Sequence, residues 1–144
     1  MKPTQILLVE DDPNDAALTL HALRKANICN EVIVAKDGAD ALQYLFGETF
    51  IVGREDLPAL VLLDLRLPKV SGLEVLERIR GHERTRMLPV LILTSSDDEQ
   101  AIMKGHVMGA NAIVRKPVTA ADFTGAAKQL GLYWFLVDKA PALG

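Results

Sequence analysis

Five short apolar runs, each about as long as a β-strand, constrain the fold of this chain more than any other feature of its sequence. They are continuous and consist mostly of Val, Ile and Leu: Ile6–Val9, Val32–Ala35, Leu60–Leu63, Val90–Leu93 and Ala112–Val114. A strand that is apolar on both faces needs cover on both faces, as strands in a parallel sheet have. The runs therefore predict a parallel sheet with helices on either side.

Helix start signals lie between these runs. Each one is a side chain that can accept a hydrogen bond from the first turn of a helix, followed by a residue suited to that turn. The pairs are Asp12 with Pro13, Asp37 with Gly38, Ser71 with Glu74, Ser96 with Glu99, and Thr119 with Asp122. Asp12 is thus an expected N-cap. The alternation of five strands with five helices predicts a doubly wound α/β domain.

Length and composition indicate one globular domain over residues 1–144. The chain is 49% hydrophobic with a formal net charge of −3, and it has no linker, repeat or low-complexity segment. These values exclude a disordered chain and a strongly basic surface. The densest basic cluster runs from Arg78 to Arg86, but Glu77 precedes it directly and Glu83 interrupts it. We interpret it as a solvated helix end and expect no nucleic-acid partner.

The cysteine count and the lengths of the apolar runs indicate the compartment in which the protein works. Cys29 is the only cysteine, so an intramolecular disulfide is excluded, and we expect it to be a small buried residue. No apolar run approaches the roughly 20 residues of a membrane span. We therefore expect a soluble, cytoplasmic protein. The connection from Gly47 to Pro58 contains three successive apolar residues, and it could be either a lid or a packed excursion.

Acidic residues stand where the apolar runs end. Glu10 and Asp11 follow the first run, and Asp64 follows the third. In open parallel sheets the ligand crevice lies at the carboxyl ends of the strands, so these side chains converge if the two strands are neighbours. At an effective dielectric constant near 20, two carboxylates ~4 Å apart repel by about 4 kcal/mol, which favours a bound cation. Oxygen ligands without nearby His or Cys favour Mg2+.

A hydroxyl and a lysine complete this set. Thr94 ends the fourth run and Lys116 follows the fifth. Either residue alone could be an ordinary strand end, and the acids alone could be loop or capping residues. Together these side chains provide an acid nucleophile, ligands for a metal ion, a hydroxyl donor and an ammonium group. This set suits phosphoryl transfer onto Asp64.

Four segments carry a family likeness. "ILLVEDDPND", "VLLDLRLPKVSGLEVLERIR", "LPVLILTSS" and "GANAIVRKPVT" resemble the CheY-like receiver domain of two-component response regulators, over almost the whole chain. The resemblance implies a flavodoxin-like sheet with strand order 2-1-3-4-5. "EDDPNDA", the loop before Leu60 and "GLYWFLVDKAP" are similar to single-domain regulators that partner bacterial and cyanobacterial phytochrome kinases.

The resemblance also implies roles for individual residues. Asp64 would accept a phosphoryl group from a histidine kinase, with Mg2+ held by Asp11, Asp64 and the backbone carbonyl of Arg66, while Glu10 would act through water. By the same likeness Thr94 contacts the phosphoryl group and signals its presence, Lys116 pairs with it, and the Lys116–Pro117 peptide bond is cis. Such a protein catalyses its own phosphorylation and slow dephosphorylation, and is no conventional turnover enzyme.

Two positions depart from the family pattern. Receivers often have an aromatic residue three places before the lysine, where this chain has Ile113, so an aromatic flip cannot report phosphorylation here. Arg66 stands two places after the acceptor, where smaller residues are common. A long cation there either shields the acyl phosphate from water or contacts the kinase, which leaves the lifetime of the phosphorylated state open.

The last residues suggest how the signal leaves the protein. An apolar helical extension is expected over about residues 130–140, and its centre is Tyr133, Trp134, Phe135, Leu136 and Val137. A helix apolar on all sides needs cover, which could come from its own sheet or from a second copy. We favour a symmetric homodimer through this tail and the face of the fifth strand and fifth helix. Output would pass to a separate protein.

Two other functions remain as alternatives. A phosphatase of the haloacid dehalogenase type also uses a strand-end aspartate, a hydroxyl, a lysine and Mg2+, but it expects an acid where Arg66 stands. A pseudo-receiver would have the fold without the chemistry, which the intact acid, hydroxyl and lysine set disfavours. Flavin binding would need phosphate-cradling loops where this chain has carboxylates.

Overall fold

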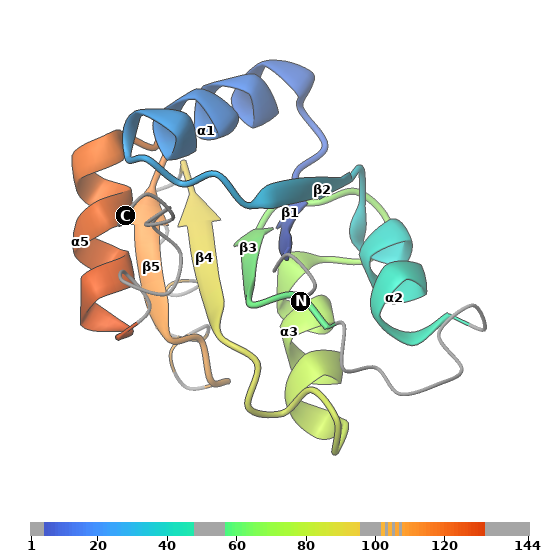
Figure 1. Cartoon of the computed structure of the whole chain (residues 1–144). Coiled ribbons are helices and arrows are strands. Elements are labelled where there is room, and N and C mark those ends of the chain that lie inside the picture. Colours follow the sequence, from blue (N-terminus) through green and yellow to red (C-terminus); the bar gives the residue numbers. More distant parts are fainter. Residues whose placement is uncertain are drawn as a thin grey trace.

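The computed structural model describes residues 5–47, 57–95, 102, 104, 106 and 108–131. The elements are β1 (Gln5–Val9), α1 (Pro13–Lys25), β2 (Glu31–Ala35), α2 (Gly38–Phe46), β3 (Leu60–Asp64), α3 (Gly72–Gly81), β4 (Val90–Thr94), β5 (Ala112–Arg115) and α5 (Ala120–Gln129). Within the described residues strands and helices alternate from β1 to β4, and β5 is followed by α5 (Figure 1). Each strand extends a predicted apolar run by one residue.

The strands form one parallel sheet in the order β2-β1-β3-β4-β5, which confirms the predicted fold class. Ile6 of β1 pairs with Val32 of β2 on one side and with Leu60 of β3 on the other. The winding direction reverses between β1 and β3. A crevice at the carboxyl ends of these two strands is the usual ligand position in such sheets.

Alternate side chains of the central strands enter two separate cores. Leu8, Leu62 and Leu93 pack with residues of α1 and α5, including the buried Phe123. Their neighbours in the strands pack with residues of α2 and α3 on the other face. Figure 1 shows α1 and α5 on one side of the sheet and α2 and α3 on the other. This two-sided burial explains why the runs are continuously apolar.

Four of the five predicted helix caps are present. The Asp12 side chain accepts from the backbone N–H of Asn14 (2.8 Å), and Asp37 and Thr119 make the same type of bond in α2 and α5. Ser71 and Glu74 form a complete capping box at the start of α3. The pair Ser96 and Glu99 lies outside the described residues, as do residues 48–56 of the long connection and the apolar segment 133–137.

Two expectations about single residues were wrong. Cys29 is exposed, because Ile28 before it fills the core beside α1 and the next side chain points the opposite way. Arg80 is no solvated end of a helix. Its guanidinium donates to the carbonyl oxygens of Leu88 (2.7 Å), Gly109 (2.9 Å) and Arg86 (3.2 Å), and to Oδ1 of Asn111 (2.8 Å). It therefore ties α3 to the loops that lead into β4 and β5.

No helix in the described part of the chain has both the length and the apolar character needed to cross a membrane.

Candidate functional site

The two-residue period of the strands brings Glu10, Asp64 and Lys116 to one face of the sheet. They follow Leu8, Leu62 and Val114 by two positions, and these three residues all pack in the core beneath α1 and α5. Since side chains two apart in a strand point to the same side, the two acids and the lysine lie above the same face at its carboxyl edge.

Three carboxylates meet at this edge. Glu10, Asp11 and Asp64 each place an oxygen atom within 4.8 Å of the others. Glu10 and Asp64 are buried, with 2% and 4% of their surface exposed, while Asp11 is exposed and open to solvent. This set of oxygen donors fits a hard divalent cation such as Mg2+, which keeps several waters and takes few protein ligands.

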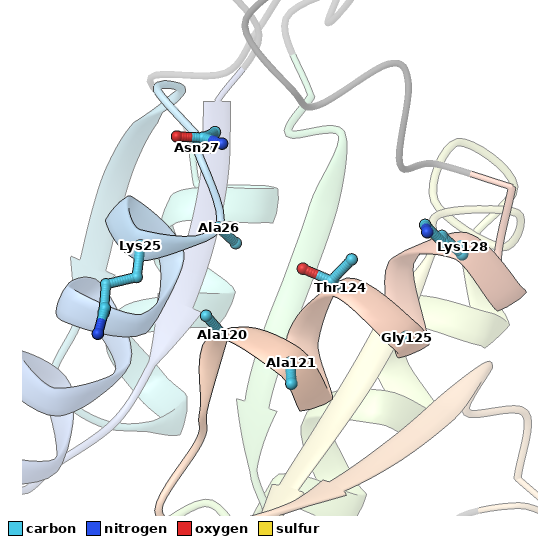
Figure 2. Close-up of a pocket in the computed structure, with 8 residues that line it drawn as sticks. All are labelled: Lys25, Ala26, Asn27, Ala120, Ala121, Thr124, Gly125 and Lys128. Atoms are coloured by element: carbon cyan, nitrogen blue, oxygen red, sulfur yellow. The ribbon is translucent and has the colours of Figure 1, made fainter.

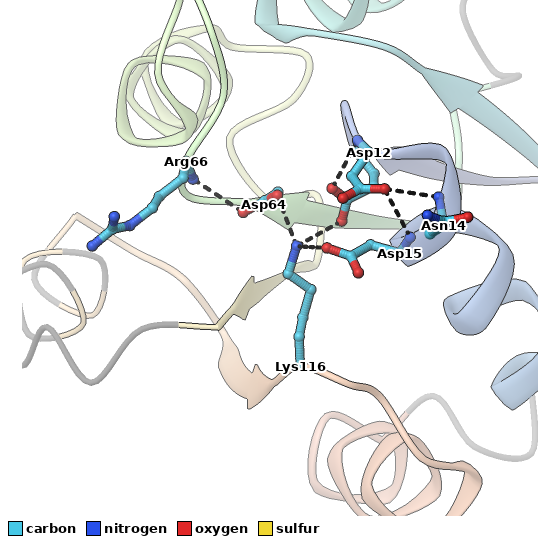
Figure 3. A network of polar contacts seen from close by, with 7 residues as sticks. Asp12, Asn14, Asp15, Asp64, Arg66 and Lys116 are labelled. Atoms are coloured by element: carbon cyan, nitrogen blue, oxygen red, sulfur yellow. Dashed lines mark hydrogen bonds and ion pairs between the residues drawn. The ribbon is translucent and has the colours of Figure 1, made fainter.

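Lys116 lies at the centre of the cluster and contacts three carboxylates. Its Nζ donates to Oε1 of Glu10 (3.0 Å), to Oδ2 of Asp64 (3.0 Å) and to Oδ2 of Asp15 (2.9 Å), as Figure 3 shows for the two aspartates. An ammonium group has three N–H donors, so each carboxylate takes one. Burial by itself would lower the pKa of Lys116, but the bonds to Asp15, Glu10 and Asp64 outweigh it and raise the pKa above its ordinary value.

The pKa of the Glu10 carboxyl group is raised by its surroundings. Burial, helped by the nearby charge of Asp64, raises the pKa of Glu10 to about 7, although the bond from Lys116 acts in the opposite direction. The Glu10 carboxylate also accepts from the backbone N–H of Asp12 (3.2 Å). A second positive charge close to Glu10 would thus be stabilising.

The loop after β3 fixes the Asp64 carboxylate. Oδ1 of Asp64 accepts from the backbone N–H of Arg66 (3.0 Å), so its two oxygens have different partners. In Figure 3 the Arg66 side chain extends away from the lysine and the carboxylates. Gly72 lies so close to this loop that a Cβ atom there would be 2.3 Å from the Asp64 carbonyl oxygen.

The remaining predicted residues stand around this centre. Thr94 is buried at the end of β4, next to β3, and its carbonyl oxygen accepts from the backbone N–H of Lys116 (2.8 Å). The Lys116–Pro117 peptide bond is cis. Ile113 is partly buried among the residues that face α2 and α3.

Asp15 is the one residue of this network that the sequence analysis missed. It lies in the first turn of α1, and its side chain is 35% exposed. In the sequence Asp12 and Pro13 indicate a helix start, and Asp15 belongs to the segment "EDDPNDA" that carries the family likeness, but neither observation gives Asp15 a partner. A signal was available, because a helix that covers the Glu10 and Asp64 face begins directly above those acids.

A separate pocket of about 510 Å³ lies between α1 and α5, lined by Lys25, Ala26, Asn27, Ala120, Ala121, Thr124, Gly125 and Lys128 (Figure 2). It shares no residue with the acidic cluster. Its walls are mostly small side chains, with one lysine on each helix.

Comparisons with known proteins agree with this geometry. Residues 6–128 match the family model of the response regulator receiver domain. A curated relative, the probable methanogenesis regulatory protein FilR2 of Methanothrix harundinacea, is 35% identical over 139 residues, which are 96% of this chain and 88% of that protein.

Solved structures of similar proteins cover nearly the whole chain. The bacteriophytochrome response regulator AtBRR is 46% identical, with a TM-score of 0.81 over 96% of this chain and 99% of that one. The phosphorylated cyanobacterial phytochrome response regulator RcpA is 32% identical, with a TM-score of 0.74 over 93% of this chain and 95% of that one.

Proposed function

Because the chain belongs to the response regulator receiver domain family, we propose that Asp64 is its phosphoryl acceptor and that Mg2+ binds beside it. The observation that carries the proposal is the meeting of Glu10, Asp11 and Asp64 within 4.8 Å, with the Lys116 ammonium 3.0 Å from Asp64. Phosphorylation by a histidine kinase with Mg2+ is the general mechanism of this family.

In the proposed reaction one oxygen of the Asp64 carboxylate attacks the phosphorus atom of a phosphohistidine. The new O–P bond forms as the N–P bond breaks, and the electron pair of that bond returns to the histidine nitrogen. Asp11, Asp64 and the carbonyl oxygen of Arg66 would hold Mg2+, with Glu10 acting through a water. The bound ion would offset the negative charge of the transferring group.

The side chains around Asp64 would receive the new oxygens. Lys116, which follows β5, would supply positive charge next to the phosphoryl group, and the Thr94 hydroxyl can donate to a phosphoryl oxygen. Phosphorylation adds roughly −1.5 to −2 charge, enough to draw Thr94 and Lys116 toward it. Since these two residues end β4 and follow β5, the change would reach the surface of β5 and α5.

The test is phosphorylation of the full chain by acetyl phosphate in the presence of Mg2+, followed by mass spectrometry of the intact protein. We expect one phosphoryl group on the wild type and none on Asp64→Asn. Glu83→Gln, which removes an exposed carboxylate between α3 and β4, should be labelled like the wild type. Undiminished labelling of Asp64→Asn would refute the assignment, and turnover of many phosphate esters per chain would favour the phosphatase alternative.

We also propose a phytochrome-type histidine kinase as the partner. The support is the high similarity to AtBRR, which is described as a bacteriophytochrome response regulator. FilR2, which is 35% identical, is described as a probable methanogenesis regulatory protein, so family membership alone does not identify the kinase. Transfer rates measured against a panel of purified histidine kinases should be highest for a phytochrome kinase, and a strong preference for a kinase of another class would contradict this pairing.

A homodimer through residues 133–137 and the face of β5 and α5 remains our proposal for the assembly. A pocket of about 400 Å³ on that face, lined by Ile113 and Val114 together with polar residues such as Arg115 and Gln129, supports it as a contact surface. Light scattering should give the mass of a dimer for the full chain and of a monomer for a chain that ends at Leu132. An unchanged mass would count against it.

A further inference from the structure

Lys116 has one carboxylate partner that the proposed chemistry does not use. Glu10 directly follows β1 and Asp64 ends the neighbouring strand β3, whereas Asp15 reaches Lys116 from the first turn of α1. The Asp15 bond, at 2.9 Å, is as short as the other two. Figure 3 shows Asp15 pointing from α1 toward the lysine.

A phosphoryl group on Asp64 would need hydrogen bonds from the Lys116 ammonium, which already donates to three carboxylates. All three N–H groups of the Lys116 ammonium have acceptors, and one of these acceptors is Asp64 itself. The several oxygens of a phosphoryl group on Asp64 would therefore compete with Glu10 and Asp15 for the other two N–H groups. Glu10 is a costly partner to release, because its side chain is 0% exposed and water has no open path to replace the lysine. The Asp15 side chain is 35% exposed, so water can replace the lysine.

We propose that Asp15 is a positioning residue that holds Lys116 in the resting protein and competes with the phosphoryl group for its ammonium. This inference rests on the proposed function of Asp64. The carboxylate of Asp15 lowers the affinity of the site for phosphoryl oxygens by occupying their donor. The same negative charge raises the affinity of the neighbouring carboxylates for a divalent cation.

The two effects have opposite signs, which separates competition from damage to the fold. Loss of the Asp15 charge should tighten the binding of a phosphoryl analogue and weaken the binding of Mg2+. A variant that merely distorted the start of α1 would weaken both. Asp15→Asn suits this purpose, because the amide keeps the shape of the side chain and removes its charge.

The experiment uses the full chain in two titrations followed by NMR. In the first, Mg2+ alone is added; in the second, beryllium trifluoride, which binds an aspartate carboxylate in place of a phosphoryl group, is added at saturating Mg2+. For Asp15→Asn we expect the Kd of Mg2+ to rise and the Kd of beryllium trifluoride to fall, each by about two- to fivefold, the range of a partly exposed ion pair.

Glu83→Gln is the control. Glu83 is exposed between α3 and β4, apart from both the acidic cluster and the face of β5 and α5, and its loss changes the net charge equally. It should shift neither constant. Weaker binding of both ligands by Asp15→Asn, or equal shifts in the two variants, would overturn the proposal.

Two further outcomes are informative. If Asp15→Asn unfolds, Asp15→Ser replaces it with the same expected signs. A wild type that binds neither Mg2+ nor beryllium trifluoride would overturn the proposed function together with this inference. A wild type that binds both ligands while Asp15→Asn matches Glu83→Gln would overturn this inference alone.

Discussion

Replacement of Gly72 by alanine should displace the loop that carries Asp64, because the new methyl group would clash with its backbone. A Cβ atom at this position would lie 2.3 Å from the carbonyl oxygen of Asp64 and 2.8 Å from Cα of Leu65. Nonbonded carbon contacts are favourable at roughly 3.5–4.0 Å, so the loop after β3 would have to move by about 1 Å. We expect Gly72→Ala to lower the free energy of unfolding by about 1–3 kcal/mol, as overpacking usually does.

The same movement would displace the Asp64 carboxylate. Residues that orient metal ligands typically contribute about 10- to 100-fold to metal affinity, so we expect Gly72→Ala to weaken Mg2+ binding by about tenfold. Urea unfolding followed by circular dichroism measures the first effect, and Mg2+ titration measures the second.

Gly81, the last residue of α3, provides the control. A Cβ atom there would meet nothing within 4 Å. Gly81→Ala should stabilise the protein by about 0.4–1 kcal/mol through the lower entropy of its unfolded chain, and leave Mg2+ affinity unchanged. Wild-type stability and Mg2+ affinity in Gly72→Ala would refute the steric reasoning.

Three further substitutions test the fold, each by urea unfolding. Arg80→Met removes the donor for four protein acceptors and should cost roughly 2–3 kcal/mol; Arg78→Met, on the exposed side of the same helix, should cost under about 1 kcal/mol, and equal losses would contradict the role of Arg80. Ser71→Ala removes the capping box of α3 and should cost about 1 kcal/mol; no loss would show that the cap is dispensable. Leu62→Ala, in the fully buried centre of β3, should cost about 3–5 kcal/mol, and a loss below 1 kcal/mol would contradict tight packing there.

The strands and caps were predictable because their causes are local. A continuous run such as Leu60–Leu63 indicates burial on both faces wherever it occurs, and Ser71 with Glu74 forms its bonds within one turn. The meeting of Glu10 with Asp64 followed from the same pattern, because parallel strands align their carboxyl ends at one edge.

The residues that were missed or misinterpreted depend on contacts between elements. The bond from Lys116 to Asp15 requires α1 to begin over the face that the lysine shares with Glu10. Arg80 binds mainly backbone carbonyl oxygens, and these have no residue-type signature in a sequence. The sequence around Cys29 does not show whether its side chain points into the core or to solvent, because this depends on how the neighbouring Ile28 packs.

Helix α3 is fastened to the sheet at both ends. At its start Gly72 packs closely against the backbone of Asp64. Near its end the Arg80 guanidinium donates hydrogen bonds to the loops that lead into β4 and β5. A helix held in this way cannot slide or rotate without breaking one of these attachments. We therefore expect α3 to keep its position when Asp64 is modified. Any movement should occur in elements that are not attached at both ends.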